Sequence, residues 1–378
     1  MKVIIFTMNG GNGTIVPSYA LANYLNENGC QAKVIDIMAE TNPLGDLLCN
    51  GYNFLLRYSI FSASMYMELA HTFPIDNFST FNKMSCKRLG VLLDKENPDA
   101  IVLICPWISR MILSAVKKLK NTNRLQPLVF VNVVDLGTGM TLSWINNNVD
   151  FTFLPTDNAY RFLTAQGLNQ KKTSVLGVPL LKEFEAGSVT ESEKVKAKLK
   201  NNFRVNDFVV AILGGSEGGT YTLSILKKLQ KHLNGFEYIV QCGTNQRLYT
   251  KIEILTKIYK NVHPMGFVDS MRELYSMSDI VITKPGAITI SELIISRVPF
   301  IIITYPIVMP QERGNVDFVK ENKLGFIAND IQSLSGIIQN IRTGEIRIAY
   351  KKSSEKVRNN LFGTRKIGDK IISEIEKK

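Results

Sequence analysis

The sequence has few of the residues on which several common functional sites depend. Its five cysteines are odd in number and widely scattered, and no Cys-X-X-Cys pair occurs. This pattern predicts buried, reduced thiols in a cytosolic protein and argues against a disulfide framework or a zinc site. The three histidines, His71, His232 and His263, do not have metal-ligand spacing. We therefore expect no bound metal and no cofactor.

Long hydrophobic runs are also missing. The longest, such as residues 208–213 and 300–304, have the length of strands, whereas a membrane-spanning helix needs roughly 20 apolar residues. The N-terminal residues run directly into a strand pattern without a small-residue cleavage site, so we expect no signal peptide. These features predict a cytoplasmic protein.

Acidic residues are fewer than lysine and arginine, which gives the chain a formal net charge of +12. Such a surface attracts polyanions, namely nucleic acid, anionic lipid headgroups or nucleotide phosphates. The sequence has no helix-turn-helix, zinc-finger or RNP-like signature, so nucleic acid is not a predicted partner. Hydrophobic residues make up 45% of the 378, which indicates a globular chain long enough for two domains.

Apolar runs alternate with helical stretches in each half of the chain, a pattern typical of parallel sheets covered on both faces. The strands expected in the first half are residues 2–8, 32–38, 100–105 and 128–134, with helices over 15–28 and 110–120. The second half restarts with strands 208–213, 238–241, 280–283 and 300–304, and with helices 221–233 and 288–296. The predicted domains are residues 1–181 and 208–352, with a polar linker or solvated helix over 182–207 and a C-terminal helix over 353–378 that can pack back on the first domain.

Two glycine-rich turns follow the first strand of each half. Residues 9–14, Asn-Gly-Gly-Asn-Gly-Thr, are neither a dinucleotide fingerprint nor a P-loop, but Gly13 lies where backbone amides can meet an anion or a hydroxyl. Residues 214–219, Gly-Gly-Ser-Glu-Gly-Gly, repeat the device, and the amides around Gly215 and Ser216 could hold a diphosphate. Taken alone, the first turn could equally be only a tight strand-to-helix connection, but two such turns, one per half, are less expected by chance than one.

A third strand-to-helix junction spans residues 284–292, Lys-Pro-Gly-Ala-Ile-Thr-Ile-Ser-Glu. The amides of Ile288 and Thr289 and the Thr289 hydroxyl would face phosphate, and Glu292 could accept hydrogen bonds from ribose. Alternatively, Glu292 stabilises the helix dipole and Lys284 is a solvated charge at the rim.

Two further polar groups are candidates for chemistry. Gln311 and Glu312, at the start of Gln-Glu-Arg-Gly-Asn315, suit sugar hydroxyls, or else merely begin a polar helix. Asp135 comes just after the strand 128–134, where a catalytic carboxylate or a helix cap is expected.

The segment of residues 47–73 is rich in aromatic and aliphatic side chains and poor in charge. A core helix is the usual meaning of such a stripe. The apolar residues surround the helix more fully than one face requires, so an acyl-chain or membrane-surface site competes with that interpretation.

Taken in order, these motifs resemble a known family. The matching segments are residues 52–58, 134–139, 177–179, 214–219, 241–243, 266–268, 279–286, 291–292 and 311–315. They are similar in order and spacing to the GT-B glycosyltransferases of family 28, above all monogalactosyldiacylglycerol synthases and bacterial diacylglycerol glucosyltransferases. The resemblance covers most of the chain and implies an α/β GT-B fold, with two Rossmann-like doubly wound domains that face a cleft. The absence of any Asp-X-Asp motif fits this architecture rather than one that grips the diphosphate through a metal.

The resemblance also implies roles for individual residues. The donor would be UDP-glucose or UDP-galactose in the C-terminal domain, and the acceptor a lipid such as diacylglycerol bound by the N-terminal domain at an anionic membrane surface, on the inner face of the cell membrane. The implied donor contacts are uracil with Phe267 and Val268, diphosphate with Ser216 and Thr289, ribose with Glu292, and hexose with Gln311 and Glu312, in the motif that ends at Asn315. Transfer would invert the anomeric centre and need a general base.

The sequence departs from the family where that base is expected. Thr14 and Met140 stand near the positions at which the family carries histidines. Threonine is not basic at neutral pH, so Asp135 is the first candidate for the base and His71 the second. A polyprenyl-linked or soluble acceptor, or a catalytically silent nucleotide-sugar-binding protein, stay open as alternatives.

Overall fold

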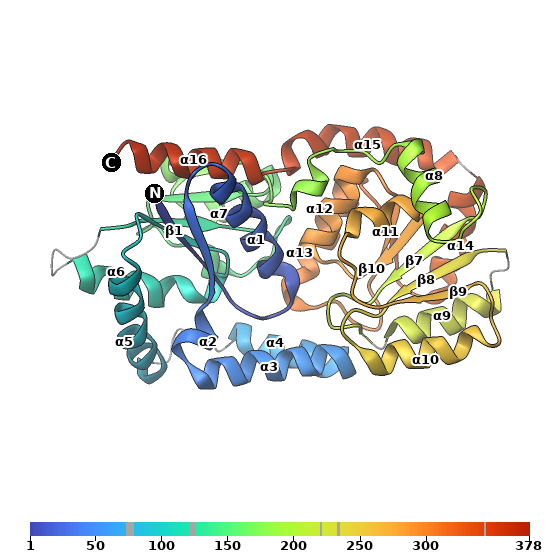
Figure 1. The fold of residues 1–378 in the computed structure, drawn as a ribbon, viewed down its shortest axis with the longest axis horizontal. Coiled ribbons are helices and arrows are strands. Elements are labelled where there is room, and N and C mark those ends of the chain that lie inside the picture. The colour runs from blue at the N-terminus through green and yellow to red at the C-terminus, as the bar shows by residue number, and fades with distance from the viewer. Residues whose placement is uncertain (73–78, 121–125, 220, 233–234, 344) are drawn as a thin grey trace. The chain divides into compact units, whose positions relative to one another are not determined.

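The computed structural model describes residues 1–72, 79–120, 126–219, 221–232, 235–343 and 345–378 (Figure 1). The chain divides into two compact units. The first contains residues 1–52, 66–181 and 360–378, and the second contains residues 53–65 and 182–359. The units differ from the expected domains in that residues 53–65 and 353–359 join the second unit.

The first unit is built on a parallel sheet of six strands in the order β2-β1-β3-β4-β5-β6. Its strands are β1 (Lys2–Thr7), β2 (Gln31–Asp36), β3 (Ala100–Leu103), β4 (Leu128–Asn132), β5 (Phe151–Leu154) and β6 (Thr173–Val175). Its helices include α1 (Asn12–Glu27), α2 (Ile37–Thr41), α5 (Ser79–Glu96), α6 (Ser109–Lys120), α7 (Asp157–Ala165) and α16 (Thr364–Glu376). The inner strands are fully buried, as continuous apolar runs in a two-sided sheet require.

The second unit repeats this plan with the strand order β12-β11-β10-β7-β8-β9, again all parallel. Its strands are β7 (Val209–Leu213), β8 (Glu237–Gln241), β9 (Val262–Met265), β10 (Ile280–Thr283), β11 (Phe300–Ile303) and β12 (Phe326–Ala328). Its helices are α8 (Glu191–Lys200), α9 (Tyr221–His232), α10 (Gln246–Thr256), α11 (Met271–Met277), α12 (Ala287–Ser296), α13 (Arg313–Glu321), α14 (Ile331–Thr343) and most of α15 (Glu345–Leu361). Helices α9, α10 and α14 bury their apolar faces on one side of the sheet, and α11 and α12 lie on the other (Figure 1).

Every strand expected from an apolar run is present, with ends within two residues of the prediction, and the doubly wound α/β class is confirmed. The strands that the sequence did not reveal are β5, β6, β9 and β12. Three of these lie at sheet edges, β6 and β12 have only three residues, and β9 contains Pro264. A proline is tolerated at a sheet edge because no ladder bond is needed from its nitrogen.

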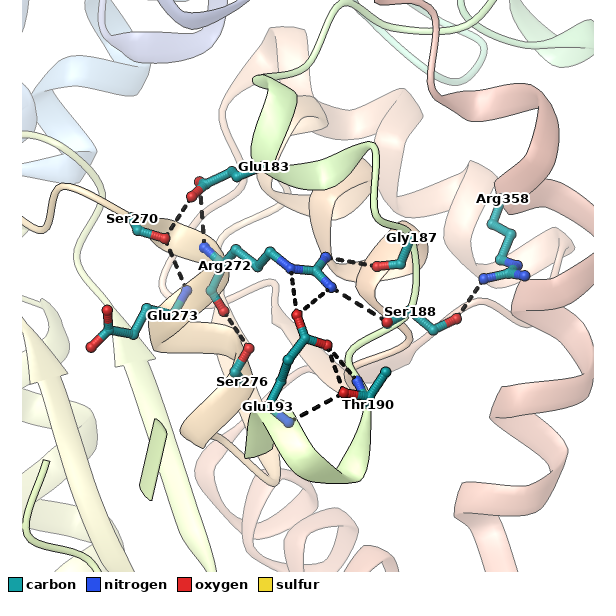
Figure 2. A network of polar contacts seen from close by, with 10 residues as sticks. All are labelled: Glu183, Gly187, Ser188, Thr190, Glu193, Ser270, Arg272, Glu273, Ser276 and Arg358. Atoms are coloured by element: carbon teal, nitrogen blue, oxygen red, sulfur yellow. Dashed lines mark hydrogen bonds and ion pairs between the residues drawn. The ribbon is translucent and has the colours of Figure 1, made fainter. Parts of the chain in front are cut away.

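Residues 182–193, expected to be part of a linker or a solvated helix, are fastened to the second unit by Arg272 (Figure 2). The buried Arg272 guanidinium donates to the Gly187 carbonyl at 2.8 Å and to Glu193 at 2.9 Å. The following helix α8 is not simply solvated either, because Lys198 is 2% exposed and pairs with Asp279 at 2.8 Å. This stretch is therefore an ordered part of the second unit.

The helix expected over 353–378 is divided between the end of α15 and α16, and α16 packs on α1 in the first unit (Figure 1). The Tyr24 hydroxyl donates to Asp369 at 2.6 Å, and Gly368 lies so close to the Tyr24 ring that a Cβ there would come within 2.3 Å of it. The preceding residues 178 and 362 form a parallel bridge. The end of the chain thus completes the first unit.

The apolar segment 47–73 forms two helices, α3 (Pro43–Tyr58) and α4 (Ile60–Thr72), and its last residue lies outside the described residues. Both helices bury part of their surface, at Cys49, Tyr52, Ala63 and Met67. Seven large apolar side chains stay between 37% and 66% exposed, namely Leu44, Leu47, Phe54, Tyr58, Phe61, Met65 and Leu69. A core role alone does not account for this segment.

Candidate active site

The glycine-rich turn of the second unit joins β7 to α9 and packs against the turn that follows β8. Gly218 and Gly243 both have positive φ angles, of 61° and 54°. A Cβ on Gly218 would lie 1.8 Å from the Cys242 carbonyl oxygen, and one on Gly243 would lie 2.2 Å from the Ser216 carbonyl oxygen. These two glycines are therefore required so that the two turns can approach each other.

Two further residues of the same turn, Ser216 and Gly215, lie against neighbouring segments. The carbonyl of Ser216 accepts from the Thr244 amide at 2.8 Å, which fixes the turn. Gly215 has a φ of 71°, and a Cβ there would meet only the Lys284 side chain, at 3.8 Å. Lys284 thus lies beside the turn, although it belongs to the end of β10.

Lys284 is held by Glu312, and the two side chains come from the ends of neighbouring strands. Lys284 Nζ lies 2.8 Å from Glu312 Oε1, with the Glu312 side chain 10% exposed. Burial lowers the pKa of the Lys284 ammonium, but the charge and hydrogen bond of Glu312 outweigh it and leave that pKa raised. Lys284 is therefore a fixed positive charge beside the turn, not the solvated rim charge that was the alternative.

Helix α12 begins directly after Lys284, Pro285 and Gly286. Gly286 is its N-cap and supplies no side-chain hydrogen bond, and the first turn contains no acidic residue. The amides of Ile288 and Thr289 in this first turn are consequently available to an anion, since the first amides of a helix lack intrahelical acceptors.

Glu292, one turn further along α12, is buried and paired with Tyr275. The Tyr275 hydroxyl donates to Glu292 Oε2 at 2.8 Å, and the Thr289 side chain hydrogen-bonds the same hydroxyl. Burial raises the pKa of the Glu292 carboxyl to about 8, while the Tyr275 hydrogen bond acts in the opposite direction. At neutral pH this carboxyl is largely protonated, so it can both donate to and accept from ligand hydroxyls.

The motif at residues 311–315 forms a short 3-10 helix, Pro310–Glu312, that leads into α13. Glu312 Oε2 is buried and meets no hydrogen-bond donor among the described residues. Asn315, 1% exposed, donates to the Pro285 carbonyl at 3.0 Å and so ties α13 to the loop before α12. Gln311 lies beside Glu312 and is half-buried. Glu312 therefore pairs one oxygen with Lys284 and has a second, buried oxygen that accepts from none of the described residues.

Phe267 and Val268, expected at the base of the nucleotide, follow β9. The Phe267 ring is 61% exposed and Val268 is half-buried. An exposed aromatic face at the end of a strand can stack on a nucleobase.

In the first unit, the turn over residues 9–14 leads into α1 without a side-chain cap, and a Cβ on Gly13 would meet no atom within 4 Å. The Asn9 amide donates to Asp36 at 3.2 Å, which anchors the turn. The Thr14 hydroxyl accepts from Thr7 at 3.0 Å and donates to the Met8 carbonyl at 3.1 Å. Because these internal contacts engage its hydroxyl, Thr14 is better explained as a brace for the turn than as a base.

Asp135 lies after β4 and accepts from the indole of Trp144, with 2.9 Å between Nε1 and Oδ2. Trp144 is 1% exposed and Met140 is 4% exposed. Thr141, rather than Asp135, caps the short 3-10 helix Leu142–Trp144. The half-buried Asp135 carboxylate is thus oriented by a rigid donor. The side chain of His71, the other candidate base, lies outside the described residues.

Three further residues, to which no motif assigned a role, support the candidate site residues. Tyr275 positions Glu292, Asp36 anchors the first glycine turn, and Arg57 pairs with Glu217 of the second turn at 2.6 Å. Arg57 lies in the family-like segment 52–58 and Asp36 inside the predicted strand 32–38, whereas no sequence pattern singled out Tyr275. Among the described residues, no group of three or more His, Cys, Asp or Glu side chains is arranged to hold a metal.

Two family models match this chain and together span most of it. Residues 18–180 match the monogalactosyldiacylglycerol (MGDG) synthase model, and residues 209–366 match the glycosyltransferase family 28 C-terminal domain. The chain is a family 28 glycosyltransferase. The turns and helix ends of the second unit lie within the second matched region and Asp135 within the first, whereas the turn over residues 9–14 precedes both.

Individual relatives agree with this assignment. This glycosyltransferase is 27% identical over 366 residues to the processive diacylglycerol beta-glucosyltransferase of Bacillus pumilus, covering 94% of this chain and 90% of that protein. Its fold is similar to that of MurG from Acinetobacter baumannii, with a TM-score of 0.65, 15% identity, and coverage of 98% and 99% of the two chains. It is also similar in fold to Anabaena Alr3699/HepE in complex with UDP-glucose, with a TM-score of 0.57, 13% identity and full coverage of both chains. These neighbours confirm the GT-B fold class.

Proposed function

We propose that this glycosyltransferase moves a hexose from UDP-glucose or UDP-galactose to a lipid acceptor such as diacylglycerol, with inversion at the anomeric carbon. One observation carries the donor half of the proposal. The Gly215 turn, the Lys284–Glu312 pair and the uncapped start of α12 converge at the carboxyl ends of β7, β10 and β11. In open parallel sheets this edge is where ligands bind.

In this proposal the diphosphate contacts the amides of residues 215–216 and 288–289, with Lys284 as the nearby positive charge. Phe267 and Val268 contact uracil, and Glu292 contacts the ribose. Glu312 Oε2 is the acceptor for a hexose hydroxyl, beside Gln311. The UDP-glucose complex of a protein with the same fold supports this choice of donor.

The chemical step is a displacement at the hexose C1. The acceptor oxygen forms a bond to C1, the bond between C1 and the phosphate oxygen breaks, and UDP leaves with the electron pair. The acceptor proton passes to Asp135, the proposed general base, whose orientation by Trp144 suits this role. Lys284 and the α12 amides stabilise the charge that develops on UDP.

The lipid half of the proposal rests on α3 and α4 and on the relatives. Exposed apolar residues recur at helical spacing along each helix, as with Phe61, Met65 and Leu69 on α4. A pocket of about 400 Å³, lined among others by Leu56, Ile60 and Ile225, lies where the α3–α4 corner meets α9. Two relatives, from Bacillus pumilus and Bacillus subtilis, are named as processive diacylglycerol beta-glucosyltransferases. We therefore propose an amphiphilic acceptor taken from a membrane surface.

No helix among the described residues combines the length and apolar character needed to cross a bilayer. We propose peripheral attachment to the inner face of the cell membrane, through the exposed apolar side chains and the net charge of +12. The five buried cysteines, none of them in a disulfide, are consistent with a reducing compartment. Flotation with vesicles tests this point. Association only with vesicles that contain anionic lipid is expected, and recovery of the protein away from all vesicles would favour a soluble acceptor.

Isothermal titration with UDP tests the donor site. We expect wild type to bind UDP, and Lys284→Met to bind it at least about tenfold more weakly because a fixed positive charge beside the diphosphate is lost. Arg204→Ala is the matched control, since Arg204 forms an exposed ion pair with Asp207 elsewhere in the second unit. Absence of UDP binding by the wild type would contradict the proposed donor.

A further inference from the structure

Arg57, near the end of α3, contacts the glycine-rich turn of the second unit. It belongs to the segment of residues 53–65 that joins this unit. Arg57 Nη2 donates to Glu217 Oε2 at 2.6 Å and to Thr244 Oγ1 at 3.2 Å. Thr244 in turn donates through its hydroxyl and its amide to the Ser216 carbonyl, at 3.2 and 2.8 Å. A single guanidinium therefore contacts the turn of residues 214–219 and the neighbouring turn after β8, which packs against it.

The Glu217 carboxylate presents an electrostatic problem in this position. It belongs to the turn that is proposed to hold the diphosphate, between Ser216 and Gly218, so this turn carries a negative charge of its own. Like charges at short range repel, which weakens binding. The Arg57 guanidinium offsets that charge directly, through an ion pair whose side chains are 33% and 22% exposed.

The guanidinium has binding capacity beyond this pair. Arg57 Nε is buried and donates to none of the described residues. A second cation, Arg247, lies over the Tyr58 ring at 5.9 Å and so adds positive charge at the same corner. The α3 end of the second unit is thus electropositive where it meets the turn.

The simpler alternative is that this ion pair only stabilises the packing of α3 against the turn of residues 214–219. Partly exposed ion pairs contribute only about 0–1 kcal/mol to stability, so a purely structural pair would leave the ligand affinity of the folded protein unchanged. The two roles therefore make different predictions for binding.

We propose that Arg57 is a positioning residue for the donor diphosphate, acting by neutralising Glu217 and holding the turn of residues 214–219. The proposal rests on the proposed function of this turn. It makes α3, a helix with an exposed apolar face, a contributor to donor binding. Loss of Arg57 exposes the diphosphate to an uncompensated carboxylate.

Titrations of the full chain with UDP and with uridine test the proposal, on wild type, Arg57→Ala, Glu217→Gln and the double variant. Arg57→Ala is expected to weaken UDP binding about tenfold and to leave uridine binding unchanged, because uridine carries no phosphate. Glu217→Gln is expected to bind UDP as tightly as wild type or more tightly. The double variant should recover to within about threefold of wild type, because the repelling charge is gone.

Each result separates the hypotheses. If wild type binds no UDP, the donor proposal fails and this inference fails with it. If wild type binds UDP and Arg57→Ala binds it equally well, only the inference fails. A double variant as weak as Arg57→Ala, or a parallel loss of uridine binding, would show a structural role instead. If Arg57→Ala does not fold, as judged by circular dichroism, weaker UDP binding by the conservative Glu217→Gln would overturn the inference.

Discussion

The two glycine-rich turns occupy equivalent places, after the first strand of each unit, but their surroundings differ. The turn of the second unit is bordered by Lys284, Glu312 and the Arg57–Glu217 pair. The turn of the first unit is braced by Thr14 and by Asp36, with open space beside Gly13. A glycine turn supplies backbone amides in both cases. The charge beside each turn comes from the end of another strand. Beside the second turn it is the Lys284 cation, and beside the first it is the Asp36 carboxylate.

This contrast predicts a division of labour, in which the second unit binds the donor and the first activates the acceptor. Asp135→Asn tests it with the largest expected effect. Loss of the base should lower kcat about 10²–10⁴-fold and leave the Kd for UDP unchanged. Steady-state transfer assays measure kcat, and UDP titration measures the Kd. Equal turnover by wild type and variant would show that Asp135 is not the base. A parallel loss of UDP binding would contradict the assignment of donor binding to the second unit alone.

The glycines themselves give a matched pair. Gly218→Ala places a Cβ 1.8 Å from the Cys242 carbonyl oxygen at a positive φ, so we expect a loss of about 3 kcal/mol or more in the free energy of unfolding. Gly13→Ala meets no atom within 4 Å and lies inside α1, so its stability should be unchanged or slightly higher. Denaturant unfolding of both variants measures the difference. Similar stabilities would mean that the second turn is not tightly packed.

The buried Glu292 gives the second unit a pH-dependent stability. Its folded pKa of about 8 lies above the ordinary value of 4.5, so the folded state holds a proton that the unfolded state releases between these values. Stability from this group is therefore full below about pH 4.5 and is lost as the pH rises to about 8. The loss amounts to up to about 5 kcal/mol.

Glu292→Gln removes the titrating carboxyl, and the comparison is with wild type at each pH. Unfolding free energies of wild type and variant should diverge in favour of the variant between pH 5 and pH 8. A constant difference across that range would show that the carboxyl is ionised in the folded protein.

Glu312→Gln has the smallest expected effect and sharpens the donor site. Because Oε2 is the proposed partner of a hexose hydroxyl, the KM for the UDP-hexose should rise about tenfold while the Kd for UDP stays near that of wild type. Lys284→Met should weaken both. If Glu312→Gln weakened UDP and UDP-hexose equally, Glu312 would act only through Lys284.

The sequence alone predicted the features that depend on local pattern. The buried strands and the strand-to-helix turns at residues 214 and 284 were visible because apolar runs and glycines are local signals. The Lys284–Glu312 and Arg57–Glu217 pairs join residues 28 and 160 positions apart, and no local signal encodes such a contact. Tyr275 was hidden for the same reason, since a tyrosine in a short helix looks like ordinary core. The edge strands β6 and β12 were too short to stand out.

The most direct measurement of the central claim is transfer itself. Purified protein is incubated with UDP-glucose or UDP-galactose and with vesicles that contain diacylglycerol and anionic lipid, and the lipids are analysed by mass spectrometry. We predict a product heavier than diacylglycerol by one hexose residue, formed by wild type and nearly absent with Asp135→Asn. A wild-type protein that binds UDP but forms no hexosylated lipid under these conditions would contradict the account.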